Sequence, residues 1–594
     1  MAAGRYPIEW DLGCFYDALD VPAIEEDKAE LSRRIECFLR KCSKLTVDSL
    51  PGAVRDYDGI YRGILKIETF FSLYYQLRLQ DEKAAAEYQK TQEWVCGNFS
   101  KLSAFTVVIQ KLDYGEVKVL LQKDASFAEY RAFIEETFRQ KEHTLSTSEE
   151  TILAKMELIS SNAWHKFHEE LLTRMKFHLD GKELTLSDVV EKSNHDLDRG
   201  VRERASLALH NGLAENSFAL TSVFNNMALS HRVWGECKKY SFPEERAFFA
   251  DNIGRSTVDT MVSAVAQAYQ PICHRYFALK AKLLGFDKLQ YWDRCAQVKL
   301  SDTPAKSYSY DDAVDLVLSV FSDFSETFGN VVREMVNNSW VDVFPKPGKT
   351  SGAFACAATV DTHPFVLLNF YGGVRDVLTM AHEFGHGVHQ RLSSRNCELV
   401  ARPALNISET ASIFAEKLTN EYLLKNETDP RRKVELICSR LDDTMSTIFR
   451  QVAFFKFEQK VHNLRAEREL TAVDLDGAWR DVLSESMGDA VELHPCVNNL
   501  WGYITHFTSW AFYVYSYAFG ALFVEGLFAQ YKKSGNDFVA KYEEALSCGG
   551  TRTYSEIAAM FGINADSAEF WNDAIGMIKL EIDELEALCG TLRS

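Results

Sequence analysis

The segment His382-Glu383-Phe384-Gly385-His386 constrains this 594-residue chain more than any other part of its sequence. Side chains four residues apart project from one face of an α-helix, so the two imidazoles can share one metal ion if the segment is helical. Two histidines at this spacing, with a glutamate beside the first, are typical of a zinc site at which the glutamate acts as general base. The motif therefore predicts both a helix and a hydrolytic zinc site, with Glu383 taking a proton from water at the metal.

Local patterns around the motif predict a strand, a turn and a helix. Pro345 and Pro347 break any helix, and two short runs that suit strands follow at residues 351–355 and 365–370. Glycines at 372 and 373 then turn the chain into a helix over about residues 374–392. We therefore expect a small β-sheet next to the zinc helix.

A catalytic zinc site needs a third protein ligand, and His389 and Glu398 are the candidates nearest in sequence. His389 lies almost two turns from His382, about 10 Å along the helix axis, so we expect it to orient ligands or to face the substrate. Glu398 falls in a polar stretch that ends the helix, and nothing in the sequence fixes its direction.

Glu409 is better placed as the third ligand. It opens a second helical pattern over residues 408–424, in which Ser412 and Glu416 fall on the same face. A helix that returns antiparallel to the first can present Glu409 to the metal, with Ser412 and Glu416 positioned to orient the ligands.

The rest of the chain is strongly helical in pattern. Only 12 prolines interrupt 594 residues, and apolar residues recur at three and four positions, as in residues 23–45. Ser146 and Glu149 read as a capping box that opens an amphipathic helix through Ile152 and Met156. The most apolar run, residues 510–524, is too short to span a bilayer and suits a buried helix. A mainly α protein is expected.

Charge and cysteine usage limit the possible partners. The formal net charge of -19 and the lack of a basic stripe argue against nucleic-acid binding. The first residues show no secretory signal pattern, and thirteen scattered cysteines without a C-x-x-C pair fit free thiols in a reducing compartment. We expect a soluble cytoplasmic protein that does not act at a membrane; its oligomeric state does not follow from these patterns.

The two motif segments together resemble the M3 peptidases, the group of thimet oligopeptidase and oligoendopeptidase F. HEFGHGVHQ at residues 382–390 and SETASIFAEKL at residues 408–418 match H-E-[FL]-G-H-x-x-H and E-x-x-S-x-x-x-E. Trp10-Asp11-Leu12 and Tyr291-Trp292-Asp293 are similar to landmarks of the oligoendopeptidase F branch. The resemblance implies that His382, His386 and Glu409 bind one zinc ion per chain.

The resemblance also implies a fold and a domain organisation. These are a large two-lobed helical fold with a deep central channel, an N-terminal helical region over residues 1–195 that forms part of the channel wall, and a catalytic region over residues 196–594. A channel of this kind admits short peptides and excludes folded proteins.

A downstream segment completes the expected site. His506 and the run from Tyr513 to Gly520 resemble the HF...FYVYxYAxG stretch of oligoendopeptidase F, where a His and a Tyr face the zinc. A tetrahedral intermediate needs hydrogen-bond donors opposite the nucleophile, so His506 and Tyr513 are expected to stabilise the oxyanion, with Tyr517 as the next candidate. Tyr513 and Tyr517 share a helical face, whereas Tyr515 points away.

These expectations describe a zinc-dependent metalloendopeptidase that hydrolyses internal bonds of short unstructured peptides. The substrate is expected to lie extended along the predicted strand, with Gly352 and Ala353 offering backbone hydrogen bonds. A metallocarboxypeptidase or peptidyl-dipeptidase on a related helical scaffold is the nearest alternative. A non-catalytic helical peptide-binding protein is the alternative from another class.

Overall fold

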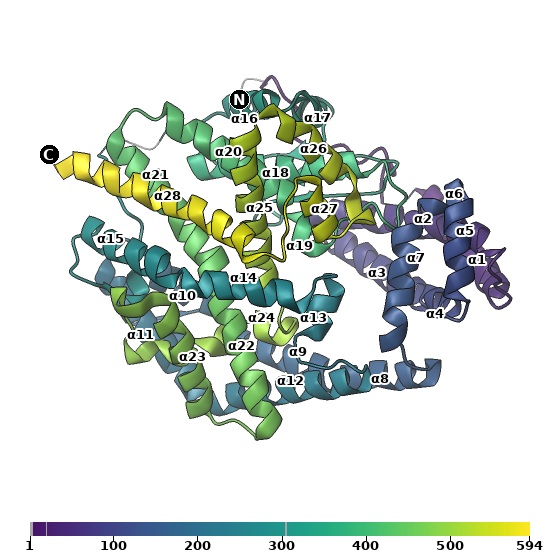
Figure 1. The fold of residues 1–594 in the computed structure, drawn as a ribbon, viewed down its shortest axis with the longest axis horizontal. Helices are drawn as coiled ribbons and strands as arrows, with labels where there is room; N and C mark the ends of the chain where they lie inside the picture. Colours follow the sequence, from purple (N-terminus) through teal and green to yellow (C-terminus); the bar gives the residue numbers. More distant parts are fainter. Residues whose placement is uncertain (1–3, 20, 303–305, 594) are drawn as a thin grey trace. The chain divides into compact units, whose positions relative to one another are not determined.

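The computed structural model describes residues 4–19, 21–302 and 306–593. The chain divides into two compact units, each assembled from three separated segments. Unit 1 comprises Met1–Glu142, Pro304–Lys425 and Gln530–Gly562, and unit 2 comprises His143–Thr303, Asn426–Ala529 and Ile563–Ser594. Helices dominate both units, so the prediction of a mainly α fold is confirmed (Figure 1). The expected division into an N-terminal region, residues 1–195, and a catalytic region, residues 196–594, stays a prediction.

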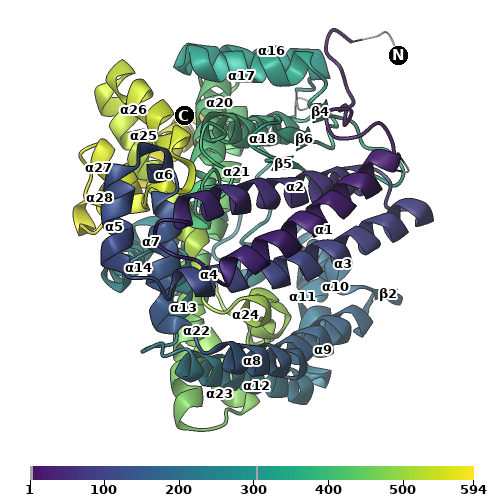
Figure 2. The same ribbon diagram turned by 90° about the vertical axis from the view of Figure 1, so that its right-hand side faces the viewer.

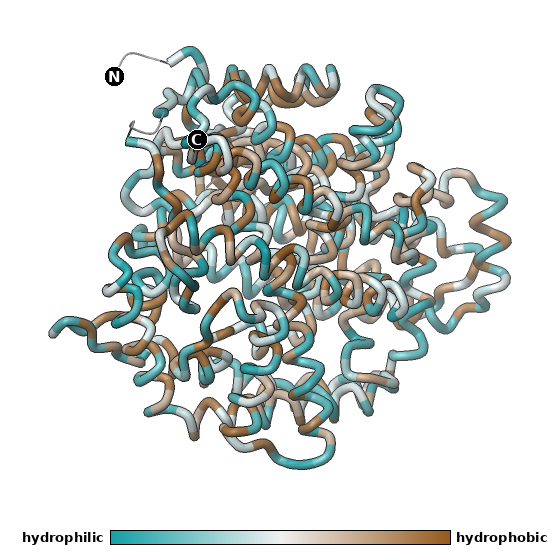
Figure 3. The backbone as a smooth tube through the Cα atoms, turned by 60° about the vertical axis from the view of Figure 1, so that its left-hand side comes forward, coloured by the Kyte–Doolittle hydropathy of each residue, from teal (hydrophilic) through white to brown (hydrophobic). Residues whose placement is uncertain are grey.

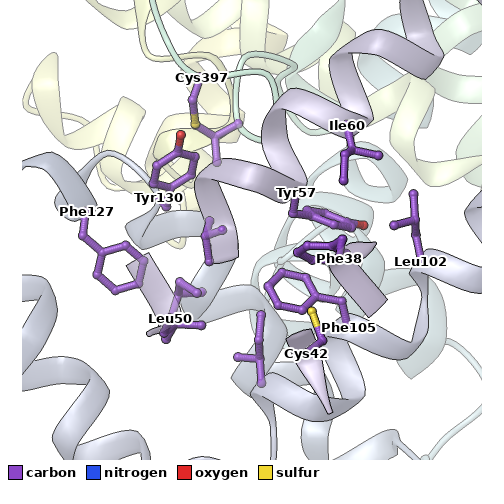
Figure 4. Packing of buried hydrophobic residues seen from close by; sticks show 14 of the residues in the cluster. Phe38, Cys42, Leu50, Tyr57, Ile60, Leu102, Phe105, Phe127, Tyr130 and Cys397 are labelled. Atoms are coloured by element: carbon purple, nitrogen blue, oxygen red, sulfur yellow. The ribbon is translucent and has the colours of Figure 1, made fainter. Parts of the chain in front are cut away.

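Unit 1 begins with helices that pack side by side (Figure 2). Phe105 lies at the centre of their core, with its ring centroid 4.9 Å from those of Phe38 and Tyr57 (Figure 4). Cys397 and Val400, from a loop far along the chain, belong to the same buried cluster. These helices are α1 (Pro22–Cys42), α2 (Leu50–Gln76), α3 (Glu82–Leu102), α4 (Ala104–Ile109), α5 (Tyr114–Lys123), α6 (Ala125–Ala128) and α7 (Arg131–Arg139).

A three-stranded sheet in unit 1 has the order β4-β6-β5. β4 (Val341–Asp342) pairs parallel with β6 (Phe365–Leu367), and β5 (Phe354–Cys356) pairs antiparallel with β6. β5 contacts helix α18 (Val374–Ser393), which carries the histidine motif, so the predicted small sheet next to the zinc helix is confirmed.

The first predicted strand begins later than expected, at Phe354 instead of residue 351. Gly352 has a φ of +80°, a left-handed conformation that ends extended structure, and its carbonyl accepts from Asn369 Nδ2 at 2.8 Å. Gly352 and Ala353 therefore precede β5, and their predicted contact with substrate stays a prediction.

The sheet also packs on the N-terminal segment. The ring centroids of Trp10 and Phe15 lie 5.9 Å and 5.4 Å from that of Phe365 on β6. Backbone bonds join the same segments, because Val343 N donates to Ile8 O at 3.0 Å. The remaining helices of unit 1 are α16 (Tyr310–Phe324), α17 (Glu326–Asn337), α19 (Leu405–Ser408), α20 (Thr410–Asn426), α26 (Asn536–Ser547) and α27 (Tyr554–Met560).

Unit 2 is a second helical body with two short strand pairs. Its strands are β1 (Phe177–Leu179) with β2 (Lys182–Leu184), antiparallel, and β3 (Leu289–Gln290) with β7 (Val491–Glu492), parallel. Its helices are α8 (Thr147–Ile159), α9 (Ser161–Arg174), α10 (Leu186–His195), α11 (Arg199–Glu215), α12 (Ser217–Cys237), α13 (Glu245–Ala250), α14 (Arg255–Gln267), α15 (Arg275–Leu283), α21 (Pro430–Thr444), α22 (Arg450–Glu467), α23 (Ala472–Met487), α24 (His506–Ser509), α25 (Tyr515–Ser534) and α28 (Ala568–Arg593).

Polar and apolar residues alternate along most helices, as amphipathic packing requires (Figure 3). The predicted capping box between Ser146 and Glu149 is present at the start of α8, but the helix leaves Ile152 and Met156 exposed instead of burying them. The predicted buried helix at residues 510–524 is confirmed from Tyr515 onward. No helix in the described parts of the chain is long and apolar enough to cross a membrane. All thirteen cysteines are free thiols.

Candidate metal centre

Helix α18 presents the histidine motif against helix α20. Gly385, between the two histidines, lies so close to α20 that a Cβ atom there would meet Ala411 O and Ser412 Cα at 2.7 Å. Any larger residue would push the two helices apart. The glycine of the motif thus brings the backbone of α20 within reach of the histidines.

The structure brings His382, His386 and Glu409 together. Glu409 Oε2 lies 3.3 Å from His382 Nε2 and 3.2 Å from His386 Nε2. One ligand atom from each of the three residues lies within 4.8 Å of the others. Glu409 directly precedes α20, and its carbonyl accepts from Ile413 N at 3.1 Å, so the second helical pattern starts with this residue as predicted.

The donor set of this cluster suits zinc, which takes imidazole nitrogens and a carboxylate oxygen in catalytic sites with three protein ligands. Burial opposes the charge of Glu409, but hydrogen bonds with His382 and His386 outweigh it and hold the pKa of this carboxyl well below its usual range. Burial likewise opposes a charged His382, yet hydrogen bonds with Glu409 and Glu416 raise its pKa to about 10. Glu409 and Glu416 therefore favour positive charge on the imidazole of His382, and the carboxylate of Glu409 stays ionised between the two histidines.

Two further polar contacts surround these residues. Glu416 Oε2 lies 3.1 Å from His382 Nδ1, and Ser412 Oγ donates to Glu409 Oε2 at 2.7 Å. When Glu416 accepts the proton of His382 Nδ1, the other ring nitrogen, Nε2, is the one that can bind a metal ion. These contacts agree with the expectation that Ser412 and Glu416 orient the metal ligands. That role stays a prediction.

Glu383 lies beside the cluster, with only 7% of its surface exposed. Its carboxylate accepts from the backbone N–H of Ala355 on β5, and burial raises its pKa. Its second oxygen, Oε2, is buried without a hydrogen-bond partner among the described residues. A carboxylate held at one oxygen and free at the other can exchange a proton with a molecule beside it.

His389 and Glu398 lie outside the cluster of three candidate ligands. Burial, and then the neighbouring His386, lower the pKa of His389 to about 4, and its ring bonds to the backbone of Ser408. Glu398 is buried and accepts from Val360 N at 3.0 Å. Their positions agree with the preference for Glu409 as third ligand.

Comparison with known proteins identifies the family of this chain. The model described as peptidase family M3 matches residues 192–577, and a second model, described as oligopeptidase F, matches residues 109–177. The chain belongs to peptidase family M3. It is a metalloendopeptidase, and the resemblance found in the motifs is confirmed.

Relatives of this M3 peptidase cover most of its length. Oligopeptidase PepF of Bacillus subtilis is 27% identical over 77% of this chain and 69% of its own. An oligoendopeptidase F homologue of Lactococcus lactis is 28% identical over 86% and 85%. The crystal structure of a peptidase from Chlamydophila abortus, 22% identical, superposes with a TM-score of 0.85 over 98% of each chain and so has the same fold.

The downstream residues predicted to complete the M3 site lie in unit 2. His506 Nε2 is 3.2 Å from Tyr517 Oη, and the rings of Tyr513 and Tyr517 make an edge contact at 5.2 Å. Tyr513 precedes α25 rather than lying on it, whereas Tyr515 points elsewhere, as predicted, and donates to Asp251 at 2.6 Å. The roles of His506, Tyr513 and Tyr517 stay predictions.

Two polar residues of this M3 peptidase escaped the sequence reasoning. Gln390 Nε2 donates to Ala355 O at 3.1 Å, and the carboxylate of Glu383 accepts from the N–H of the same residue. Two side chains of α18 therefore bind the backbone of Ala355 on β5. The position of Gln390, four residues after His386 on the same helix, could have indicated it. Arg450, at the start of α22, adds to burial in lowering the pKa of His506, and no local pattern marks this pairing.

Proposed function

We propose that this protein is a zinc-dependent oligoendopeptidase that hydrolyses internal bonds of short, unstructured peptides. The convergence of two imidazole nitrogens on one carboxylate oxygen of Glu409, in a chain of family M3, carries the proposal. The buried carboxylate of Glu383 beside this point supports its assignment as general base. When bound, zinc supplies a Lewis acid that polarises a peptide carbonyl and makes a water molecule more acidic.

Different residues bind the metal, orient its ligands and transfer the proton. His382, His386 and Glu409 hold the metal, Glu416 fixes the ring of His382, and Ser412 fixes the carboxylate of Glu409. Glu383 takes the proton from the attacking water and later delivers it to the leaving amine.

Donors are needed for the negative charge that develops on the carbonyl oxygen. His506 and Tyr513 are proposed for this part, with Tyr517 as the next candidate. Burial, then the charge of Arg450, lower the pKa of His506, so its imidazole tends to be neutral and can donate one N–H. No covalent intermediate with the enzyme is required.

Two substitutions test the assignment of base and ligand. Glu383→Gln should keep bound zinc yet lower kcat by about 10²-fold or more, because the amide cannot accept the proton. Glu409→Ala should lose both zinc and activity. Zinc content by elemental analysis and turnover of a quenched peptide separate the two effects, and full zinc occupancy in Glu409→Ala would refute that ligand.

The products decide between the candidate reactions. Mass spectra that show internal cuts support an oligoendopeptidase. Stepwise loss of one or two residues from the C-terminus would instead identify a carboxypeptidase or peptidyl-dipeptidase. Peptide binding without any cleavage at saturating zinc would identify a binding protein.

A further inference from the structure

Tyr515 lies between two tyrosines proposed for the oxyanion, and the proposed function gives it no part. Its side chain is fully buried, with 0% of its surface exposed. The ring packs against Phe248 on α13 and Phe455 on α22, at centroid distances of 5.2 and 5.7 Å. A phenylalanine would make the same ring contacts, so packing alone does not explain why a hydroxyl is buried at this position.

The hydroxyl of Tyr515 binds a carboxylate of the same unit. Tyr515 Oη donates to Asp251 Oδ2 at 2.6 Å, and Ser516 Oγ donates to the same oxygen at 2.8 Å. Asp251 directly follows α13, and its backbone N–H donates to Ala247 O at 3.1 Å, which ties it to the end of that helix. One carboxylate oxygen therefore binds the first two residues of α25, and a carboxylate is a stronger acceptor than a neutral oxygen.

The backbone of Tyr513 is linked to this carboxylate through Ser516. Ser516 N donates to Tyr513 O at 3.0 Å, so the residue whose side chain binds Asp251 also binds the carbonyl of Tyr513. Phe512, directly before Tyr513, has a φ of +61°, which residues other than glycine adopt rarely. A segment with such a backbone keeps its place only when surrounding contacts hold it. A shift of Ser516 away from Asp251 would therefore move Tyr513 as well.

We propose that Asp251 and Tyr515 are positioning residues for Tyr513, and that their hydrogen bond holds Tyr513 where its hydroxyl can donate to the oxyanion. The proposal rests on the proposed function and deepens it, because it assigns a part in the reaction to two residues that do not touch the substrate. A hydrogen bond suits this part better than ring packing, because it fixes direction as well as distance. A displacement of about 1 Å can cost about 10²-fold in rate, so the loss of this bond should be visible in kcat.

The substitution Tyr515→Phe tests the proposal, because it removes the hydroxyl and keeps the buried ring. In the zinc-loaded full chain it should lower kcat for a quenched peptide by about tenfold and change KM by less than about twofold, because Tyr513 acts on the transition state. Asp251→Ala should have the same effect from the other side of the bond. Asp251→Asn, whose amide oxygen can still accept from both hydroxyls, should recover most of the kcat lost in Asp251→Ala.

A double substitution separates positioning from general damage to the fold. Tyr513→Phe alone should lower kcat by about 10²-fold, because it removes the proposed donor. Adding Tyr515→Phe to Tyr513→Phe should then change kcat by less than about twofold, since no hydroxyl is left to position. A purely structural role of Tyr515 would instead give the same loss in both backgrounds.

Tyr276 on α15 provides the matched control. It is a fully buried tyrosine of unit 2 whose hydroxyl also binds a carboxylate, Asp442 Oδ1, at 2.7 Å. Tyr276→Phe should lower the midpoint of thermal unfolding about as much as Tyr515→Phe does, because each loses one buried hydrogen bond. Its kcat should stay within about twofold of wild type, because Tyr276 has no link to Tyr513.

Three results would overturn the positioning proposal alone. These are a wild-type kcat in folded Tyr515→Phe and Asp251→Ala, the same loss from Tyr515→Phe with and without Tyr513→Phe, and a loss of kcat in Tyr276→Phe as large as that in Tyr515→Phe. Zinc content and thermal unfolding identify the variants that fold, and Tyr515→Phe, the smaller change, decides the question if Asp251→Ala does not fold.

Two other results would reach further. A wild-type kcat in Tyr513→Phe would refute Tyr513 as the oxyanion donor and overturn the positioning proposal with it. Absence of cleavage by the wild-type protein at saturating zinc would contradict the proposed function itself, and this proposal with it.

Discussion

Glu458 on α22 carries a buried carboxylate that is only partly satisfied. Its Oε1 accepts from Phe512 N at 2.7 Å, while Oε2 is buried without a partner among the described residues. Burial raises the pKa of this carboxyl well above its usual range, and the nearby Glu244 adds to the rise. Phe512 directly precedes Tyr513 and has a φ of +61°, so Glu458 holds a turn that the chain would otherwise adopt rarely.

The substitution Glu458→Gln tests this arrangement through the pH dependence of the free energy of unfolding. A raised folded-state pKa means that the folded protein binds the proton more tightly than the unfolded chain, so wild-type stability falls as pH rises above the ordinary glutamate range. Glu458→Gln avoids that loss and keeps an acceptor for Phe512 N. We expect its free energy of unfolding to exceed that of wild type by about 1–3 kcal/mol near about pH 8, and by less near about pH 5.

Denaturant unfolding at the two pH values measures the difference. Glu458→Ala is the matched control, because it removes the charge and also leaves Phe512 N buried without an acceptor, and it should be less stable than Glu458→Gln at both pH values. A difference between Gln variant and wild type that does not change with pH would contradict the prediction.

At the level of elements, the contact between α18 and α20 builds the candidate metal centre. Gly385→Ala would place a Cβ atom 2.7 Å from Ala411 O and Ser412 Cα, both backbone atoms that cannot move aside alone. The helices must then separate, and Glu409 moves away from the histidines. We expect a loss of about 1–3 kcal/mol in the free energy of unfolding together with weaker zinc retention.

The neighbouring Gly387 provides the control for this substitution. A Cβ atom at Gly387 would meet Met335 Sδ at 2.5 Å, but this is the flexible end of a side chain on α17 and not on α20. Gly387→Ala should therefore retain zinc better than Gly385→Ala in elemental analysis after dialysis. Equal zinc retention and equal stability in the two variants would show that the helix contact does not set the position of Glu409.

Periodic patterns made α18 predictable almost to the residue, because its apolar face and its histidines repeat at helical spacing. The second segment was predictable for the same reason, since Glu409, Ser412 and Glu416 share a helical face. The start of β5 could not be predicted in this way, because the carbonyl of Gly352 accepts a hydrogen bond from the side chain of Asn369, 17 residues away. The hydrogen bonds of Ala355 with Glu383 and Gln390 join a strand to a helix, and no pattern within either segment reports such a contact.

At the scale of the whole molecule, the main feature is that unit 1 is built from three segments that lie far apart in the sequence. Trp10 and Phe15 pack on Phe365 of β6, and the helices between residues 22 and 139 share a buried cluster with Cys397 and Val400. The core beside the candidate metal centre is therefore built partly from the first residues of the chain. Contacts over hundreds of residues leave no local signal, so periodic patterns in the sequence do not show that unit 1 combines three separated segments.

A fragment of residues 196–594 tests this dependence. It lacks the first 142 residues of unit 1, so the sheet and the loop near residues 397–400 lose their apolar cover. We expect the fragment to unfold without a cooperative transition and to retain little zinc, and coexpression with residues 1–195 to restore both. Circular dichroism melting and zinc analysis measure the outcome, and a fragment that melts cooperatively with full zinc would refute the prediction.

The same segment order has a consequence for synthesis. Phe365, which Trp10 and Phe15 cover, is made more than 300 residues after them, and the last segment of unit 1 runs to Gly562, near the end of the chain. During translation Phe15 can meet Phe70 early, with which its ring lies in contact at 6.5 Å, but Phe365 emerges much later from the ribosome. We therefore expect unit 1 to finish folding, and peptidase activity to appear, only after the segment up to Gly562 has left the ribosome.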